Sequence, residues 1–244
     1  MKSVMAVSMH KAGSTIADRI IAVIAAARGY RIDQLSRQLT ASALAEPDFL
    51  EMQAPRMTTE GVYYGIARHP GSLTFSMLPK LRVIMQLRDP RDCLTSAYYS
   101  FSKSHVPPED PEKRRAFEAR RSKLRSMEID EHVLQGAENY RRRMQGLANL
   151  AKTHPDLVIL RYEDMVTDTD AWLQAIAETL DQPLDDALRA KLAPVADFSV
   201  AQEDPGQHKR QVTPGDHARK LKPDTIAALN DTLGPVMTQL GYLV

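Results

Sequence analysis

Residues 3–28 read SVMAVSMHKAGSTIADRIIAVIAAAR, and this stretch decides the fold class. Its first part, residues 3–9, is a short apolar run between polar neighbours, which is typical of a buried strand. Residues 10–15 (HKAGST) predict a loop, and residues 16–28 are rich in helix-forming residues. Gly29 is a natural helix stop. The chain therefore begins with a strand, a glycine-containing loop and a helix.

The same alternation continues along the chain. Strand-like apolar runs occur at residues 61–67 (GVYYGIA), 81–87 (LRVIMQL) and 157–162 (LVILRY). Helices are predicted at residues 93–102, 138–152, 171–180, 185–192 and 223–240. The highly charged residues 112–127 are either a solvated helix or a mobile flap, and residues 31–60 give no firm assignment. This pattern indicates a single α/β domain over residues 1–244, with a mostly parallel, doubly wound central sheet flanked by helices.

Composition excludes several classes of function. The 244 residues carry a net charge of +1, so no basic field points to nucleic acid. The one cysteine, Cys93, allows no internal disulfide, which suits a reducing compartment. His/Cys spacings typical of a metal site are missing from the sequence. The longest uncharged run near the N-terminus, residues 20–27, is too short to cross a bilayer. We therefore expect a cytoplasmic protein without membrane insertion.

The loop at residues 10–15 has the features of a phosphate-binding loop. It joins a strand to a helix N-terminus, where backbone N–H groups and the helix dipole favour an anion. Lys11 adds a positive charge, Gly13 allows close approach, and Ser14 or Thr15 is expected to cap the helix. A Walker A loop ends in Gly-Lys-Ser/Thr, whereas here the lysine precedes the glycine, which argues against a magnesium-dependent kinase.

The loop also resembles the 5′-phosphosulfate loop of sulfotransferases, Pro-Lys-Ser-Gly-Thr-Thr, with Ala12 in place of the serine and His10 in place of the proline. After the strand at 81–87, the sequence RDPRD begins at Arg88, and Ser96 follows eight residues later. This is similar to the family's 3′-phosphate motif. The resemblance implies a P-loop-like fold and the co-substrate 3′-phosphoadenosine 5′-phosphosulfate, with no metal.

Two further segments are similar to family elements. Tyr162 begins a Tyr-Glu-Asp segment, which implies that this ring lies near the adenine. Near the C-terminus the family has Arg-Lys-Gly, two residues, and Gly-Asp-Trp. Residues 210–217 (RQVTPGDH) keep only part of that pattern. By resemblance Arg210, followed by Gln211 and Val212, contacts the 3′-phosphate, and Lys209 is the alternative.

Sulfuryl transfer needs a base for the acceptor, and histidine is the natural choice near neutral pH. His69 resembles the family's catalytic base, because it follows a strand-like run and precedes Pro70. His10, beside Lys11, is its rival. The resemblance implies in-line transfer, with Lys11 stabilising charge on the bridging oxygen and residues 12–15 holding the 5′-phosphate.

Two other functions stay open. One is an ATP-dependent small-molecule kinase with a degenerate phosphate loop, and the other is a nucleotide-binding protein that has lost catalysis. The acceptor is expected to be a hydroxyl or amine of a small molecule or glycan, and the sequence does not name it. The basic residues between Lys113 and Arg125 either steer an anionic acceptor or are simply solvated.

Overall fold

The computed structural model describes residues 1–40, 42–196 and 212–243. Contacts within the chain divide it into two compact units. The first comprises Met1–Arg88 with Gly146–Asp197, and the second comprises Asp89–Gln145 with Phe198–Val244.

The first unit is built on a five-stranded sheet in which every strand pair is parallel. Its strands are β1 (Val4–Ser8), β2 (Arg31–Ile32), β3 (Val62–Ala67), β4 (Arg82–Leu87) and β5 (Leu157–Arg161). The central strands β1 and β3 are buried at every residue, as expected of a parallel sheet covered on both faces. These bounds confirm the predicted α/β fold and its strands.

The strand order β2-β3-β1-β4-β5 contains one reversal of winding. From β1 the chain moves to the β2 side of the sheet, whereas from β4 it moves to β5 on the other side. The switch therefore falls between the neighbouring strands β1 and β4. In open parallel sheets, ligands bind beyond the carboxyl ends of the strands at such a point. The loops that follow β1 and β4 are those that carry Lys11 and Arg88.

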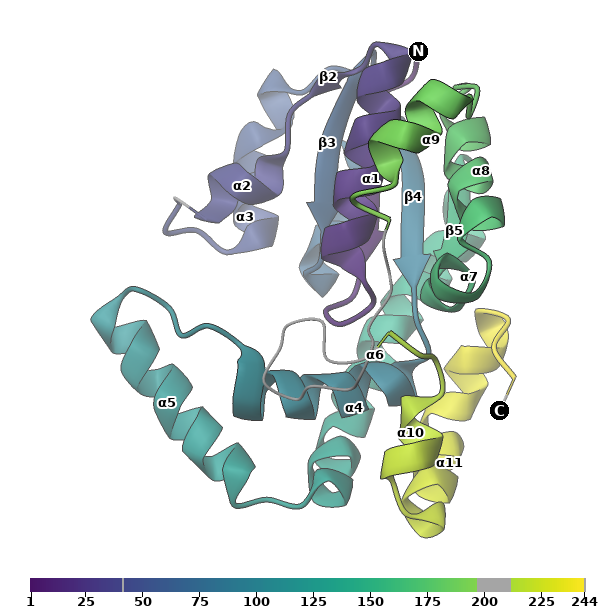
Figure 1. The fold of residues 1–244 in the computed structure, drawn as a ribbon. Helices are drawn as coiled ribbons and strands as arrows, with labels where there is room; N and C mark the ends of the chain where they lie inside the picture. The colour runs from purple at the N-terminus through teal and green to yellow at the C-terminus, as the bar shows by residue number, and fades with distance from the viewer. Residues whose placement is uncertain (41, 197–211, 244) are drawn as a thin grey trace. The chain divides into compact units, whose positions relative to one another are not determined.

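Helix α1 (Ser14–Arg28) packs on β3 and on helices α8 and α9, and Figure 1 shows it lying across one face of the sheet. Its buried residues include Ile20, Ile21 and Ile24, and Gly29 ends it in the left-handed conformation. The other helices of this unit are α2 (Leu35–Thr40), α3 (Glu46–Gln53), η1 (Ala54–Arg56), η2 (Pro70–Thr74), η3 (Leu78–Lys80), α7 (Tyr162–Thr167), α8 (Thr169–Thr179) and α9 (Asp186–Leu192).

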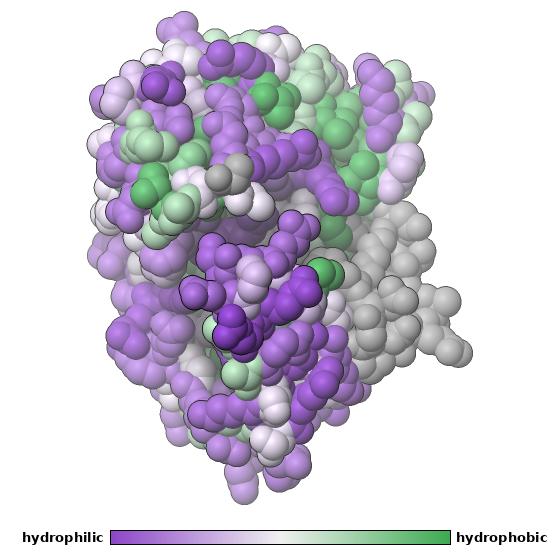
Figure 2. Space-filling model, turned by 90° about the vertical axis from the view of Figure 1, so that its left-hand side faces the viewer, coloured by the Kyte–Doolittle hydropathy of each residue, from purple (hydrophilic) through white to green (hydrophobic). Residues whose placement is uncertain are grey.

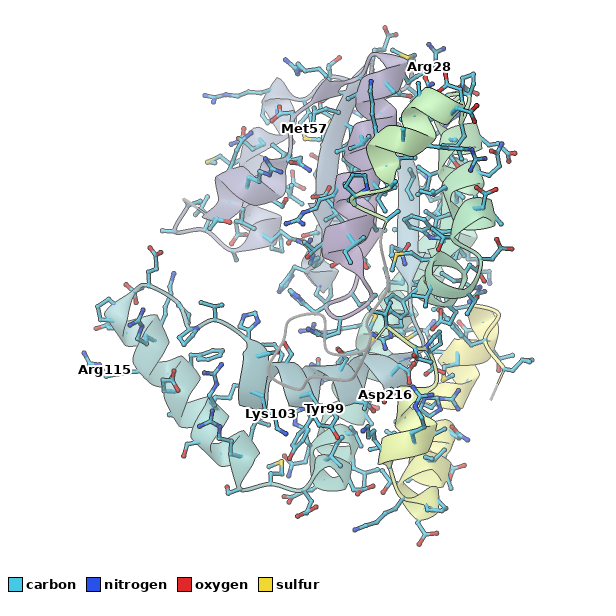
Figure 3. All side chains as sticks on the ribbon, viewed as in Figure 1. Arg28, Met57, Tyr99, Lys103, Arg115 and Asp216 are labelled. Atoms are coloured by element: carbon cyan, nitrogen blue, oxygen red, sulfur yellow. The ribbon has the colours of Figure 1, made fainter. Side chains whose placement is uncertain are left out.

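The described part of the second unit is helical. It holds α4 (Pro90–Tyr99), the π-helical turn η4 (Ser100–Ser104), α5 (Pro111–Arg125), most of α6 (Ile129–Thr153), α10 (Asp216–Lys220) and α11 (Pro223–Gln239). Helix α4 contacts α10 and α11, and α5 contacts η4. Lys103 of η4 lies over the ring of Tyr99 at 5.5 Å, and both are labelled in Figure 3 with Asp216 at the start of α10.

Two helices begin three or more residues before their predicted starts. Helix α4 begins at Pro90 rather than at Cys93, because the side chain of Asp89 accepts the Arg91 N–H and proline suits the first helical position. Helix α6 begins nine residues before position 138, at Ile129. Residues 111–125 form a helix, which selects one of the two predicted alternatives for that segment.

The surface is ordinary for a globular chain. Hydrophilic side chains cover most of the face shown in Figure 2, with apolar side chains between them. The exposed large apolar residues include Val106 and Met52, which lie far apart in the sequence. Across the described ranges, none of the helices is both long and apolar enough to span a membrane.

Candidate functional site

The loop after β1 adopts a conformation that leaves backbone donors open. Lys11 and Gly13 have positive φ angles of 72° and 74°. Gly13 is the N-cap of α1, and no side chain caps this helix. The expectation that Ser14 or Thr15 would cap it is therefore wrong. Among the described residues, the backbone N–H groups of residues 13–15 have no acceptor.

Two side chains of the β4 edge hold the carbonyl groups of this loop. Arg88 Nη1 donates to the Lys11 carbonyl at 3.1 Å, and Gln86 Nε2 donates to the Ala12 carbonyl at 3.3 Å. Because the peptide group is planar and trans, a carbonyl turned toward β4 turns the next N–H the opposite way. The bond from Gln86 therefore directs the Gly13 N–H away from β4.

Arg88 and Tyr162 enclose the same loop. The guanidinium carbon of Arg88, a residue only 7% exposed, lies 4.1 Å from the centroid of the Tyr162 ring. Tyr162 is the first residue of α7, directly after β5. A Cβ atom at Gly13 would lie 2.7 Å from Tyr162 Cδ2. The structure thus brings together Lys11, Gly13, Arg88 and Tyr162, which the sequence had singled out separately.

Two hydrogen bonds to Asp18 hold α1 against β3 and against the segment that follows β2. The Tyr63 hydroxyl donates to Asp18 Oδ1 at 2.7 Å, and Gln34 Nε2 donates to Asp18 Oδ2 at 3.1 Å. Burial raises the pKa of Tyr63 well above its ordinary value, and the Asp18 carboxylate raises it further. Tyr63 therefore stays a neutral donor that ties α1 to β3.

The segment after β3 adds a cation beside the loop. Arg68 Nε donates to Ser14 Oγ at 2.8 Å. One carboxylate oxygen, Glu46 Oε1, accepts the backbone N–H groups of Arg68 and His69, each at 2.8 Å, and the hydroxyl of Ser72 at 2.7 Å. Since three donors share this oxygen, the segment that carries His69 is fixed next to the phosphate loop.

His69 is exposed, and its ring already makes one hydrogen bond. Gly71 N–H donates to His69 Nδ1 at 3.1 Å. A ring nitrogen that accepts a hydrogen bond carries no proton, so the neutral ring has its proton on Nε2. His10, the rival base, is an exposed residue of the loop itself.

In the second unit, Asp92 is hydrogen-bonded to residues 215–217, the part of the C-terminal motif that keeps the family's glycine and aspartate. Asp92 is fully buried and accepts the backbone N–H groups of Gly215 at 2.8 Å and His217 at 2.9 Å. His217 Nδ1 lies 2.7 Å from Asp92 Oδ1. Asp92 therefore anchors the start of α10, a role that sequence reasoning did not assign.

Asp89 and Arg91 also act within this second unit. Arg91 Nη2 lies 2.7 Å from Asp89 Oδ2, and Arg91 Nη1 donates to Asn230 Oδ1 at 2.7 Å. These bonds connect the start of α4 to α11. Ser96 is half-buried on the same helix, and its hydroxyl makes no hydrogen bond to any residue the structure describes.

The remaining predicted site residues differ in their surroundings. Ala12 is fully buried, Thr15 is exposed, and Val212 is half-buried in a loop. Arg210 and Gln211, with the alternative Lys209, lie outside the described residues. Within the described ranges, no group of three or more His, Cys, Asp or Glu side chains is arranged to hold a metal ion.

Sequence reasoning missed Arg68, Gln86 and Glu46. Arg68 and Gln86 carried a usable signal, since each is a polar residue at the carboxyl end of an apolar strand in a parallel sheet. Glu46 carried none, because its partners are 22 and more residues away in the chain.

Comparison with known proteins identifies the family. The model of the sulfotransferase domain family matches residues 2–241. The chain belongs to the sulfotransferase family. A search among curated proteins gave no match.

Solved structures show the same fold. The structure of mouse sulfotransferase SULT7A1 complexed with 3′-phosphoadenosine 5′-phosphate (PAP) matches with a TM-score of 0.68. The two sequences are 15% identical, and the match covers 97% of this chain and 84% of the mouse protein's chain. Retinol dehydratase, in complex with androsterone and the inactive cofactor PAP, is 14% identical over 96% of this chain and 80% of its own, with a TM-score of 0.63. These likenesses, at low identity, establish the sulfotransferase fold.

Proposed function

We propose that this sulfotransferase moves a sulfuryl group from 3′-phosphoadenosine 5′-phosphosulfate to a hydroxyl or amine of a small-molecule or glycan acceptor, and that residues 1–244 act as one catalytic domain. The observation that carries the proposal is the start of α1, where open N–H groups at residues 13–15 lie beside Lys11 and under Arg68 and Arg88. Such a set of fixed donors and cations suits a phosphosulfate without a metal.

The proposed donor site assigns a separate role to the residues at each end of the nucleotide. The N–H groups of residues 13–15 bind the 5′-phosphate, and Lys11 stabilises charge on the bridging oxygen as that phosphate leaves. Tyr162 lies near the adenine. The 3′-phosphate ligands are Arg88, Ser96, Arg210, Gln211 and Val212. A site for the 3′-phosphate is what distinguishes this donor from ATP.

His69 is the proposed base. The acceptor oxygen or nitrogen attacks sulfur, the bond from sulfur to the bridging oxygen breaks, and the acceptor proton passes to His69. The ring must give up the Gly71 N–H bond at Nδ1 before it can accept another proton, either because Nδ1 itself takes that proton or because the proton on Nε2 moves to Nδ1 and frees Nε2. We expect His69→Ala to lose nearly all transfer while the affinity for nucleotide changes less than about twofold. Turnover like that of the wild type would remove His69 and favour His10.

The first experiment is calorimetric titration of metal-free protein with 3′-phosphoadenosine 5′-phosphate (PAP), ADP and AMP. Micromolar binding of PAP, with ADP and AMP much weaker, supports the donor site. Preference for ADP with magnesium contradicts it and favours a kinase. Tight PAP binding without transfer to any acceptor in a broad panel of alcohols, phenols, amines and glycans favours a nucleotide-binding protein that has lost catalysis.

A further inference from the structure

The guanidinium of Arg68 lies at the N-terminus of α1, where the proposed donor site begins. Its Nε atom donates to Ser14 Oγ at 2.8 Å, and Ser14 is the first residue of the helix. Ala67, just before Arg68, pairs with Val7 near the end of β1. Parallel pairing thus places Arg68 at the same sheet edge as the phosphate loop.

The charge of Arg68 is not neutralised within the described part of the chain. Its terminal nitrogens, Nη1 and Nη2, have no hydrogen-bond or ion-pair partner among the described residues. Glu46 contacts only the backbone of Arg68, and the first turn of α1 contains no acidic residue. A half-buried guanidinium offers a fork of donors that matches phosphate or sulfate oxygens. The chemistry of this position therefore calls for an anion.

Ser14 links Arg68 to the open end of the helix. Because Ser14 Oγ accepts from Arg68, its own hydroxyl proton remains available, and no described residue accepts it. A hydroxyl that accepts a hydrogen bond from a cation becomes a stronger donor. Arg68 can thus act on an anion both directly, through its terminal nitrogens, and through Ser14.

The backbone of Arg68 is fixed before any ligand arrives. Glu46 Oε1 accepts the N–H groups of Arg68 and His69 at 2.8 Å, and Ser72 Oγ completes the set at 2.7 Å. A cation held in this way loses little further freedom when an anion binds, so more of its interaction energy reaches the ligand.

We propose that Arg68 is a direct ligand of the donor's 5′-phosphate, with its terminal nitrogens on 5′-phosphate oxygens; this inference rests on the proposed function. Arg68 then shares the 5′ end with Lys11 and the N–H groups of residues 13–15. The 3′-phosphate is left to other residues.

The test separates the two ends of the nucleotide. Calorimetry gives the Kd for PAP and for adenosine 3′-monophosphate, which lacks the 5′-phosphate, and the ratio of the two measures the contribution of the 5′ end. We expect Arg68→Gln to raise the Kd for PAP about tenfold or more, and to leave the Kd for the 3′-monophosphate within about twofold. Arg68→Lys, which keeps the charge and loses the fork, should lie between wild type and Arg68→Gln.

Two control variants complete the design. Arg28→Gln removes an arginine at the other end of α1, labelled in Figure 3, and should leave the ratio unchanged. Ser14→Ala removes the partner of Arg68 Nε and should raise the Kd for PAP less than Arg68→Gln does. Thermal unfolding of each variant shows whether the fold is retained.

Each outcome decides one point. A ratio unchanged in folded Arg68→Gln overturns the proposal and leaves Arg68 a structural role. A loss in Ser14→Ala equal to that in Arg68→Gln also overturns it, because Arg68 then acts only by positioning Ser14. If wild-type protein does not bind PAP, the proposed function itself fails and the role of Arg68 fails with it.

Discussion

Helix α1 begins differently from α4, α5, α8 and α9. Each of those four has an aspartate N-cap whose side chain accepts a backbone N–H of the first turn. Each also has an acidic residue in that turn. Helix α1 has Gly13 as its N-cap, no side-chain cap and no acid in its first turn. A side chain of the chain itself therefore caps each of those four helices, whereas the N–H groups at the start of α1 have no acceptor among the described residues.

The positive end of a helix dipole can be used either for stability or for binding an anion. A capping aspartate stabilises a helix by about 1 kcal/mol and adds a favourable interaction with its dipole. Helix α1 lacks that stabilisation. The charged residues next to its N-terminus are the cations Lys11 and Arg68 and not a carboxylate. The helix dipole, the N–H groups and these cations together favour an anion from solution. Changing the charge at the start of α1 should therefore affect activity and nucleotide binding more than it affects stability.

The largest expected effect comes from removing the cation of the open helix start. Lys11→Ala should lower kcat about 10²- to 10³-fold, because one fixed donor to the developing charge is lost. The unfolding temperature should change little, since Lys11 is a half-exposed loop residue. Steady-state assays with the donor and any accepted alcohol measure kcat. Activity like that of wild type would place the charge stabilisation elsewhere.

A methyl group at Gly13 should close the start of α1. Its Cβ would meet Tyr162 Cδ2 at 2.7 Å, and the residue has a φ of 74°. We expect Gly13→Ala to lower the free energy of unfolding by about 2–3 kcal/mol and to weaken PAP binding. Gly29→Ala is a matched control, because its φ is 95° and nothing lies within 4 Å of the added atom.

The control isolates the cost of the backbone angle, which should be about 1 kcal/mol. Chemical denaturation measures both variants. Equal losses in Gly13→Ala and Gly29→Ala would show that the ring of Tyr162 moves aside without cost, and that the close packing against Gly13 is not required.

An acidic residue in the first turn of α1 should give its N-terminus the favourable charge–dipole interaction that α4, α5, α8 and α9 already have. Thr15 is exposed, so Thr15→Glu adds a carboxylate without steric conflict. We expect the free energy of unfolding to rise by about 0.5 kcal/mol and the Kd for PAP to rise about tenfold. Ala171→Glu makes the same change in the first turn of α8 and should affect stability alone. A parallel loss of PAP binding in both variants would contradict the comparison.

The smallest expected change in stability comes from α6, a helix that already has an acidic residue in its first turn. Asp130, in the first turn of α6, accepts the Lys222 N–H at 2.9 Å. Burial alone would raise the pKa of Asp130, but the Lys222 N–H, the Thr225 hydroxyl and the charge of Lys222 together lower it. A folded-state pKa below the ordinary value means that the carboxylate stabilises the fold above about pH 4.

That stabilisation is lost as the pH falls through the folded-state pKa. Asp130→Asn should therefore cost about 1 kcal/mol or less at pH 7, and the difference from wild type should shrink below pH 4. Denaturant titrations at pH 7, 4 and 3 measure it, with Glu131→Gln, an exposed neighbour, as control. A difference that stays constant with pH would show that the charge of Asp130 is not involved.

Much of the fold was predictable because its signals are local. The run of residues 3–9, the loop with Gly13 and the helix ended by Gly29 follow one another in the sequence, and each appears in the structure. The start of α4 lies three residues before the predicted one, because Asp89 caps the helix and Pro90 begins it. Residues 31–60 gave no pattern, since their short helices depend on tertiary packing, α2 against β3 and α3 against α2 and η2.

The parallel α/β fold, the phosphate loop and the resemblance to sulfotransferases could all be predicted from the sequence, because apolar periodicity and motif spacing are properties of neighbouring residues. The structure was needed to show that Gln86 and Arg88 hold the loop carbonyls, that Arg68 donates to Ser14, and that Asp92 anchors His217. These contacts join residues that are 54 to 125 positions apart. Parallel strands bring Gln86, Arg88 and Arg68 to the edge of the sheet where the phosphate loop lies, whereas Asp92 and His217 meet because α4 packs on α10. No local pattern records which of these residues will meet.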